Sequence, residues 1–255
     1  MQLWHFSPSR QQVNKTTPMK KKILLTIYTI FEEWGGVIDE ACHKGCSSCC
    51  TQNVTITAQE GVGILRYIVD QNMSAWLVEK LRCTGNHRPP TTTTNDFAAA
   101  CLGGEDIDPG DQQNFSACPF LEKKICRIYP VRPFSCRLFL STKICSPRQP
   151  ALVPDYYFEA ATAVNQLLEH LGQKEPWGNM LDVLPALAGS CEFKEIADHL
   201  TPELTRKARL QTLKASPLPG FLLSKEYAPQ VSPLLESIFS ATIDGKSIED
   251  ILNGK

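Results

Sequence analysis

The chain has 255 residues, of which 42% are hydrophobic, and its formal net charge is -1. A chain of this length buries a core without covalent staples, and its 11 cysteines are an odd number that cannot all pair internally, so a disulfide scaffold is not expected. The near-zero charge gives no global field for nucleic acid or anionic membranes, and we expect neither as a partner. Metal or redox chemistry in the reducing cytoplasm is the better prediction for these thiols.

The N-terminal part of the chain predicts an arm followed by a helix. Residues 1–18 are polar and aperiodic, which is typical of a loosely ordered arm. The lysines and apolar run that follow resemble a secretory signal, but Glu32 and Glu33 end the run and no cleavage site follows. The run is also shorter than the roughly 20 apolar residues of a membrane span. We therefore predict an amphipathic helix whose apolar stripe extends from Ile23 to Ile38.

The next region predicts a strand, a helix and a long loop. A short extended stretch ends at Thr57, which forms a capping-box pattern with Glu60. Apolar periodicity then predicts one helix that reaches to about Arg82. Residues 84–117 are rich in proline, threonine and glycine and predict mostly loop, with a helical turn at 98–102.

The remainder predicts a hairpin and further helices. Glu122-Lys123-Lys124 between apolar flanks indicates a tight hairpin, and Pro130 and Pro133 start a short helix that carries Cys136. Helical periodicity follows Pro154, with Gly172 as its C-cap, and returns at 201–215, 232–241 and 247–252. The predicted fold class is mainly α with minor β (α+β), with helices around an irregular cysteine-rich metal core and a short hairpin. The predicted units are a cysteine-cluster domain at 19–150 and a helical region at 151–255 packed on it.

The first cysteine cluster comprises Cys42, Cys46, Cys49 and Cys50. Gly45 and two serines in this stretch permit tight turns that bring several thiolates to one ion or cluster. Soft thiolate sets select zinc, copper(I) or iron-sulfur clusters. Buried cysteines acting as small apolar side chains poorly explain four within nine residues.

The second cluster comprises Cys118, Cys126 and Cys136. Arg132 and Arg137 lie near Cys136 in sequence, and we expect them to donate charge-assisted hydrogen bonds to sulfur and to lower its pKa. Seven candidate thiols exceed a four-ligand site. Neighbouring cysteines in an extended segment point to opposite sides, so one of the pair in the first cluster is expected to face away from a shared ion.

These motifs resemble the YkgJ-like family of zinc- or iron-chelating cysteine-cluster proteins. The resemblance covers roughly residues 23–140 and rests on the order CxxxCxxCC, CPFL, CxIY and RPxxCR. It implies the ligands Cys42, Cys46, Cys49, Cys50, Cys118, Cys126 and Cys136, with Tyr129, Arg132 and Arg137 around them. Many members have two residues where this chain has three between its first two cysteines. Flagellin lysine N-methylases contain a related module, which leaves an enzymatic role open by analogy.

These motifs are compatible with three functions. The first, which we favour, is a metal protein holding a [4Fe-4S] cluster rather than zinc, with a role in redox chemistry, metal handling or a larger enzyme. The second is a structural zinc module that acts through a protein partner. The third is a radical S-adenosylmethionine enzyme, whose three-cysteine spacing is matched but whose alternating strands and helices are not. The basic residues near Arg206 are predicted to form the solvent-exposed face of a helix rather than a nucleic-acid site.

Overall fold

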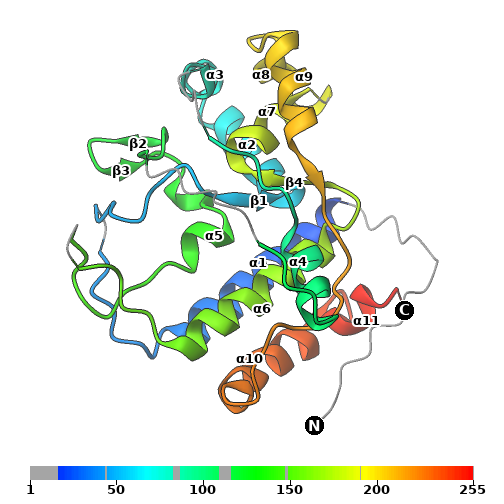
Figure 1. The fold of residues 1–255 in the computed structure, drawn as a ribbon. Helices are drawn as coiled ribbons and strands as arrows, with labels where there is room; N and C mark the ends of the chain where they lie inside the picture. Colours follow the sequence, from blue (N-terminus) through cyan, green and yellow to red (C-terminus); the bar gives the residue numbers. More distant parts are fainter. Residues whose placement is uncertain are drawn as a thin grey trace.

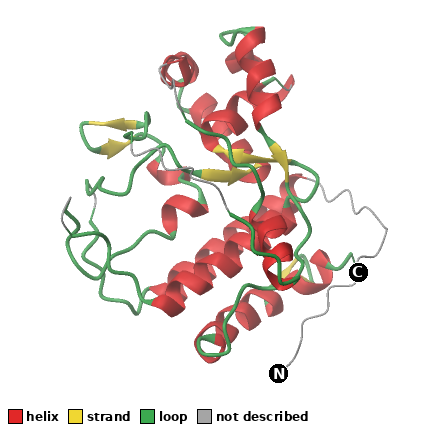
Figure 2. Ribbon diagram, viewed as in Figure 1, coloured by secondary structure: helices red, strands yellow, loops and turns green. Residues whose placement is uncertain are grey.

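The structure is a computed structural model that describes residues 17–43, 45–82, 87–108, 116–146, 149–189 and 191–254. Helices dominate, and the strands form small antiparallel sheets (Figure 2). The predicted mainly α fold class with minor β is thus confirmed. Most of the predicted arm, residues 1–16, lies outside the described residues, and the helix begins at Thr17, within the arm.

The elements follow one another as labelled in Figure 1. The α-helices are α1 (Thr17–Gly35), α2 (Ala58–Asp70), α3 (Ser74–Arg82), α4 (Thr94–Leu102), α5 (Phe134–Arg137), α6 (Asp155–Leu171), α7 (Met180–Ala188), α8 (Lys194–Ala197), α9 (Pro202–Gln211), α10 (Ala228–Ser240) and α11 (Ile248–Leu252). Two short 3-10 helices are η1 (Tyr129–Val131) and η2 (Cys191–Phe193). The strands are β1 (Thr55–Thr57), β2 (Leu121–Glu122), β3 (Ile125–Cys126), β4 (Pro176–Asn179), β5 (Leu213–Lys214), β6 (Thr242–Ile243) and β7 (Lys246–Ser247).

Helix α1 confirms the predicted amphipathic helix. Ile23, Ile27 and Phe31 are buried along one stripe, as their spacing predicts. The helix ends at Gly35, before a second glycine, so Ile38 reaches the same core from the following loop. Among the helices of the described residues, none has the length and apolar composition that a membrane crossing requires.

The single helix predicted up to about Arg82 is wrong, because the structure divides it into α2 and α3. Thr57 and Glu60 form the predicted capping box at the start of α2. The helix then ends where Asn72 adopts a left-handed φ of 55°. The Met73 amide closes the turn by donating to the Ile68 carbonyl at 2.8 Å, which is the 6→1 bond of a Schellman motif. Asparagine tolerates this conformation, and a break is the result.

The C-terminal predictions are confirmed with shifted boundaries. Helix α6 ends at Leu171 with Gly172 as its C-cap, as predicted. Helix α9 stops at Gln211 rather than near residue 215, because the next residues form β5. The predicted turn at 98–102 is the end of a longer helix, α4, which Thr93 caps. Helix α7 and strand β4 had no counterpart in the sequence prediction.

A three-stranded antiparallel sheet joins distant parts of the chain. Its order is β1-β4-β5, with Ile56 opposite Gly178 and Trp177 opposite Leu213. Asn179 ends β4 and caps α7 by accepting from the Leu181 amide at 2.9 Å. The sheet therefore fixes β1, which follows the first cysteine cluster, against the C-terminal third.

Two hydrophobic cores hold the molecule together. The first core lies among α1, α6, α10 and α11, and it includes Phe134 at the start of α5. The second core lies among β1, α2, α3, α7 and α8, and it includes Phe120 and Ile128. Both cores take residues from either side of residue 150. Figure 1 shows α1 and α6 running side by side, with the cysteine-bearing loops and α5 on one side of the molecule.

Candidate metal centre

The first cysteine cluster is a loop of tight turns between α1 and β1. The Cys46 amide donates to the His43 carbonyl at 2.9 Å, and the Cys50 amide donates to the Ser47 carbonyl at 3.1 Å. Gly45 has a φ of 93° and nothing within 4 Å of where a Cβ would lie. Its role is therefore conformational, because only glycine adopts this backbone without strain.

The second cluster is built on the β2–β3 hairpin and on α5. The predicted hairpin is confirmed, with Leu121 opposite Cys126. Its two turn residues, Lys123 and Lys124, have φ values of 50° and 67°. The predicted short helix is also confirmed as α5, which Pro133 precedes and which carries Cys136.

Backbone hydrogen bonds join the two clusters directly. The Cys118 amide donates to the Cys50 carbonyl at 2.9 Å, and the Gln52 amide donates to the Ser116 carbonyl at 3.1 Å. Thr51 and Ala117 form the antiparallel bridge between them. The last cysteine of the first motif and the first cysteine of the second are thus neighbours in space.

Four of the thiols form one mutually interacting group. We call Cys50, Cys118, Cys126 and Cys136 the inner thiols. In every pair among them, a negative charge on one of the two sulfurs raises the pKa of the other. Three of these side chains, all but Cys50, are partly buried against the second core. The four side chains therefore lie within electrostatic range of one another and come from both motifs.

The remaining three candidate thiols form a second group around Cys42. We call Cys42, Cys46 and Cys49 the outer thiols, since Cys46 and Cys49 both interact electrostatically with Cys42 and Cys49 is exposed. Cys49 also interacts with Cys136 and donates a hydrogen bond to the Cys50 sulfur. Cys49 is thus the link between the two groups.

Burial holds most of these thiols in the protonated form. It raises the pKa of the Cys118 thiol to about 11 and raises the pKa of Cys126 and Cys136. The Cys49 hydrogen bond lowers the pKa of Cys50 and correspondingly raises that of Cys49. Like charges at close range disfavour one another, so the thiols of a cluster without metal do not all ionise together.

The donor chemistry of the inner thiols fits a metal that prefers sulfur. Four thiolates are the ligand set of structural zinc and of [4Fe-4S] clusters. Within the described ranges, however, no three cysteine, histidine, aspartate or glutamate side chains already stand at ligand spacing. Metal binding would therefore draw the sulfurs together from their present hydrogen-bonded arrangement.

A buried carboxylate positions the helix that carries Cys136. Glu60 is 6% exposed, and one of its oxygens, Oε1, accepts from the Tyr28 hydroxyl at 2.6 Å and from the Phe134 amide at 2.7 Å. The other oxygen accepts from the Thr57 amide at 2.8 Å and from the Thr57 hydroxyl at 3.0 Å. Glu60 thus ties α1, α2 and the start of α5 together. Sequence reasoning identified it only as a helix cap.

The two predicted arginines are placed differently from one another. All three guanidinium nitrogens of Arg137 have oxygen partners, on Glu32, the Arg132 carbonyl and the Pro130 carbonyl. The same group lies over the Tyr28 ring, so it clamps α5 to α1 instead of donating to sulfur as expected. Arg132 stacks on the Tyr129 ring at 4.0 Å, and its charge lowers the pKa of Cys126, which burial raises overall.

The hairpin is anchored to α3 through one carboxylate. Glu122 accepts from the Trp76 indole at 2.7 Å, and Lys80 and Arg127 lie 3.5 and 3.6 Å from it. The Trp76 ring also contacts Phe120, with centroids 5.6 Å apart. These contacts hold the strand that carries Cys126 against the second core.

Among the residues that the structure describes, the other cysteines and histidines form no metal-holding group with these thiols. Cys101 is exposed, Cys145 is partly buried in the loop after α5, and Cys83 lies outside the described residues. His43 is exposed. The side chains of His87 and His170 are largely covered, and the His87 ring lies 2.8 Å from Asp182.

The comparisons with known proteins agree with the motifs. Residues 41–154 match the sequence model of the family described as "CxxCxxCC: Putative zinc- or iron-chelating domain". The family resemblance expected from the cysteine motifs is thus confirmed, and metal chelation in general is supported for this segment. No curated protein and no solved structure matches the chain significantly.

Proposed function

We propose that this protein binds a [4Fe-4S] cluster through the inner thiols, Cys50, Cys118, Cys126 and Cys136. The observation that carries the proposal is their mutual interaction in every pair, across two motifs that a backbone bridge holds together. Four cysteine thiolates are the usual ligands of such a cluster, and the partly apolar surroundings limit solvent access. All nine cysteines whose side chains are described are free thiols, which fits a reducing compartment such as the cytoplasm.

The residues of the chain have distinct tasks in this proposal. The inner thiols would lose their protons and hold the metal, while Glu60 fixes the helix that carries one of them. Arg132 supplies a positive charge near Cys126, which partly offsets the thiolate charge. When bound, the cluster supplies one-electron redox chemistry. The outer thiols are then available for ligand exchange or for redox reactions at the surface.

A structural zinc site is the second candidate, and the position of the inner thiols favours it. Three of them pack against the second core beside the fully buried Phe120, and closed sites of four cysteines are typical of structural zinc. A radical S-adenosylmethionine enzyme is not supported, because the described strands form antiparallel sheets of two or three strands rather than a barrel of parallel strands.

Metal analysis of anaerobically purified protein tests the proposal. We expect about four iron and four sulfide per chain, with broad absorbance near 400 nm, if a [4Fe-4S] cluster is bound. A colourless protein with about one zinc per chain would replace the proposal with the structural site. Electron paramagnetic resonance after reduction distinguishes cluster types.

Serine substitutions separate the two thiol groups. Cys50→Ser and Cys136→Ser should abolish metal binding, whereas Cys42→Ser and Cys46→Ser should retain the cluster. Cys101→Ser is the matched control, since this exposed cysteine lies on α4 outside both groups. Full metal content in Cys50→Ser and in Cys136→Ser would contradict the assignment of the inner thiols.

A further inference from the structure

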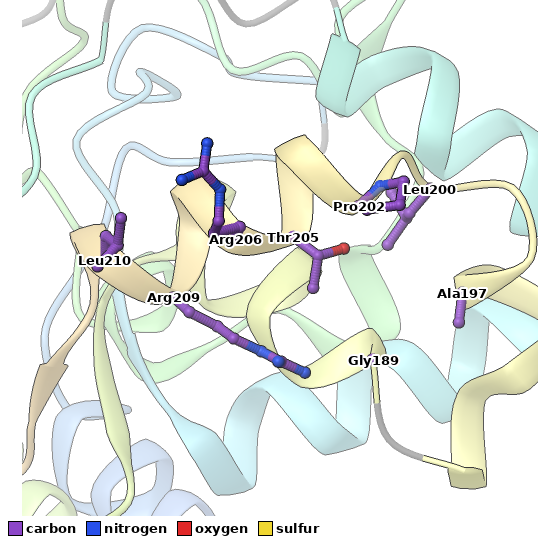
Figure 3. Close-up of a pocket in the computed structure, with 8 residues that line it drawn as sticks. All are labelled: Gly189, Ala197, Leu200, Pro202, Thr205, Arg206, Arg209 and Leu210. Carbon is purple, nitrogen blue, oxygen red and sulfur yellow. The ribbon is translucent and has the colours of Figure 1, made fainter.

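A pocket of about 440 Å³ lies between α9, the end of α7 and the C-terminal end of α8, and it shares no residue with the thiol groups (Figure 3). Two arginines and a threonine line it together with apolar side chains and a glycine. The lining residues are Gly189, Ala197, Leu200, Pro202, Thr205, Arg206, Arg209 and Leu210.

No carboxylate among the described lining residues offsets the positive charge of this pocket. The lining contains two guanidinium groups and no carboxylate. Among the residues that the structure describes, no acceptor pairs with the guanidinium of Arg206 or Arg209, whereas Arg66 and Arg127 each pair with a glutamate. Two cations that line the same pocket without a paired acceptor favour an anionic ligand.

Gly189 admits Arg209 into the pocket. The glycine has φ -69° and ψ 1°, a conformation open to any residue, so the backbone does not require glycine there. A Cβ at this position would lie 2.6 Å from Nη2 of Arg209. The missing Cβ therefore leaves room for the guanidinium to lie over the end of α7 in its present position. Figure 3 shows Arg209 extending towards Gly189, with Thr205 beside it, while Arg206 projects from another side of α9.

We propose that this pocket binds a small oxyanion, the phosphate or carboxylate group of a ligand, with Arg209 as its anchor. A guanidinium forms paired hydrogen bonds with either group, and the Thr205 hydroxyl provides a further donor. Leu200 and Pro202 offer an apolar surface for the rest of the ligand. Arg206 contributes charge at longer range. Because Arg209 is exposed, the affinity for an oxyanion alone is expected to be weak.

A purely structural role for Arg209 predicts a different result. A cation beside the last carbonyls of α7 stabilises that helix end through the helix dipole. Removal of the charge would then lower the unfolding midpoint without any effect on ligand binding. Binding and stability must therefore be measured on the same variants.

The test is a titration of the full-length, metal-loaded protein at about 0.15 M salt, where exposed charges are screened beyond about 8 Å. Inorganic phosphate and hexanoate are the probes, hexanol is the neutral control, and backbone amide NMR shifts of α9 are the readout. Phosphate binding alone identifies a phosphate ligand, and tighter binding of hexanoate identifies an apolar carboxylate. Arg209→Gln should weaken binding at least about 10-fold and Arg206→Gln by a few fold.

Lys207→Gln is the matched control, because it removes the same charge from the same helix at a position outside the lining. It should change the affinity less than about 2-fold. Arg209→Lys keeps the charge but loses the paired geometry, so it should weaken phosphate binding while folding normally. The absence of saturable binding of both probes up to about 20 mM would overturn the proposal, since even a weak oxyanion site binds in this range. Equal losses in Lys207→Gln and Arg209→Gln would also overturn it.

Discussion

The two hydrophobic cores differ in what completes them. The first core lies mainly among helices, with α1, α6, α10 and α11 contributing most of its buried side chains. The second core has helices on only part of its boundary, and the segment with Phe120, Ile128 and three inner thiols forms the rest. Helices carry their own backbone hydrogen bonds, whereas that segment is mostly turns and short strands. From this difference we expect the second core to depend on metal binding more than the first.

The largest expected effect concerns the pH dependence of metal binding. Burial raises the pKa of Cys118, Cys126 and Cys136, so these thiols are protonated at neutral pH and must lose their protons to bind metal. Affinity therefore rises with pH, by up to about 10³-fold per pH unit if three protons are released. Zinc titrations of the apoprotein between pH 6 and pH 8, with proton release measured by calorimetry in two buffers, check this. An affinity independent of pH would show that these thiols are not the ligands.

Metal loading should protect the second core more than the first. A ligand present at about 1,000 times its dissociation constant stabilises the folded state by about 4 kcal/mol. We expect hydrogen exchange to slow by the corresponding factor for amides of α2 and α7, and by much less for amides of α6 and α10. Native-state exchange on apo and loaded protein measures both sets at once. Equal protection of the two sets would remove the distinction between the cores.

Glu60→Gln should weaken the contact between the cores and the metal centre. An amide nitrogen cannot accept the hydrogen bonds that one carboxylate oxygen now receives, so two buried donors lose their acceptor. The expected loss in the free energy of unfolding is about 2–4 kcal/mol, together with a lower metal content, because α5 is no longer fixed. Chemical denaturation and metal analysis are the measurements. Glu79→Gln is the control, since that side chain is 70% exposed.

The smallest effect is expected at the tip of the hairpin. Lys123 and Lys124 both have positive φ, a conformation that asparagine and glycine adopt with less strain. The pair Lys123→Asn with Lys124→Gly should therefore raise the free energy of unfolding by about 1 kcal/mol. The same denaturation curves measure it, with the metal content unchanged. A decrease in stability would show that the lysine side chains themselves contribute to the fold.

The parts of the fold that sequence predicted are those that local chemistry specifies. The capping box at Thr57, the lysine hairpin and the glycine at the end of α6 each act within a few residues. Helix α7 escaped prediction because it contains Pro185 and is buried on most sides, which leaves no amphipathic period. Strands β4 and β5 are only four and two residues long, and they form through pairing with segments elsewhere in the chain, which no local pattern predicts.

In the candidate site too, sequence predicted the local features and missed those that depend on contacts between distant residues. The cysteine motifs identified which residues to consider, because their spacing and composition are local features. Their division into inner and outer thiols depends on the bridge between Thr51 and Ala117, which no local pattern encodes. The partners of Arg137 were equally hidden, since Glu32 lies on a helix far away in sequence.

Because the bridge between Thr51 and Ala117 holds the two motifs together, the geometry of the metal centre does not depend on how long the chain between the motifs is. Closing a longer loop costs little extra entropy, about 0.6 kcal/mol for each doubling of its length. The described segment of residues 103–108, which follows α4, should therefore accept inserted residues or a tag at little cost to the metal centre. This makes it the natural attachment point for fluorophores or affinity handles in studies of the intact protein.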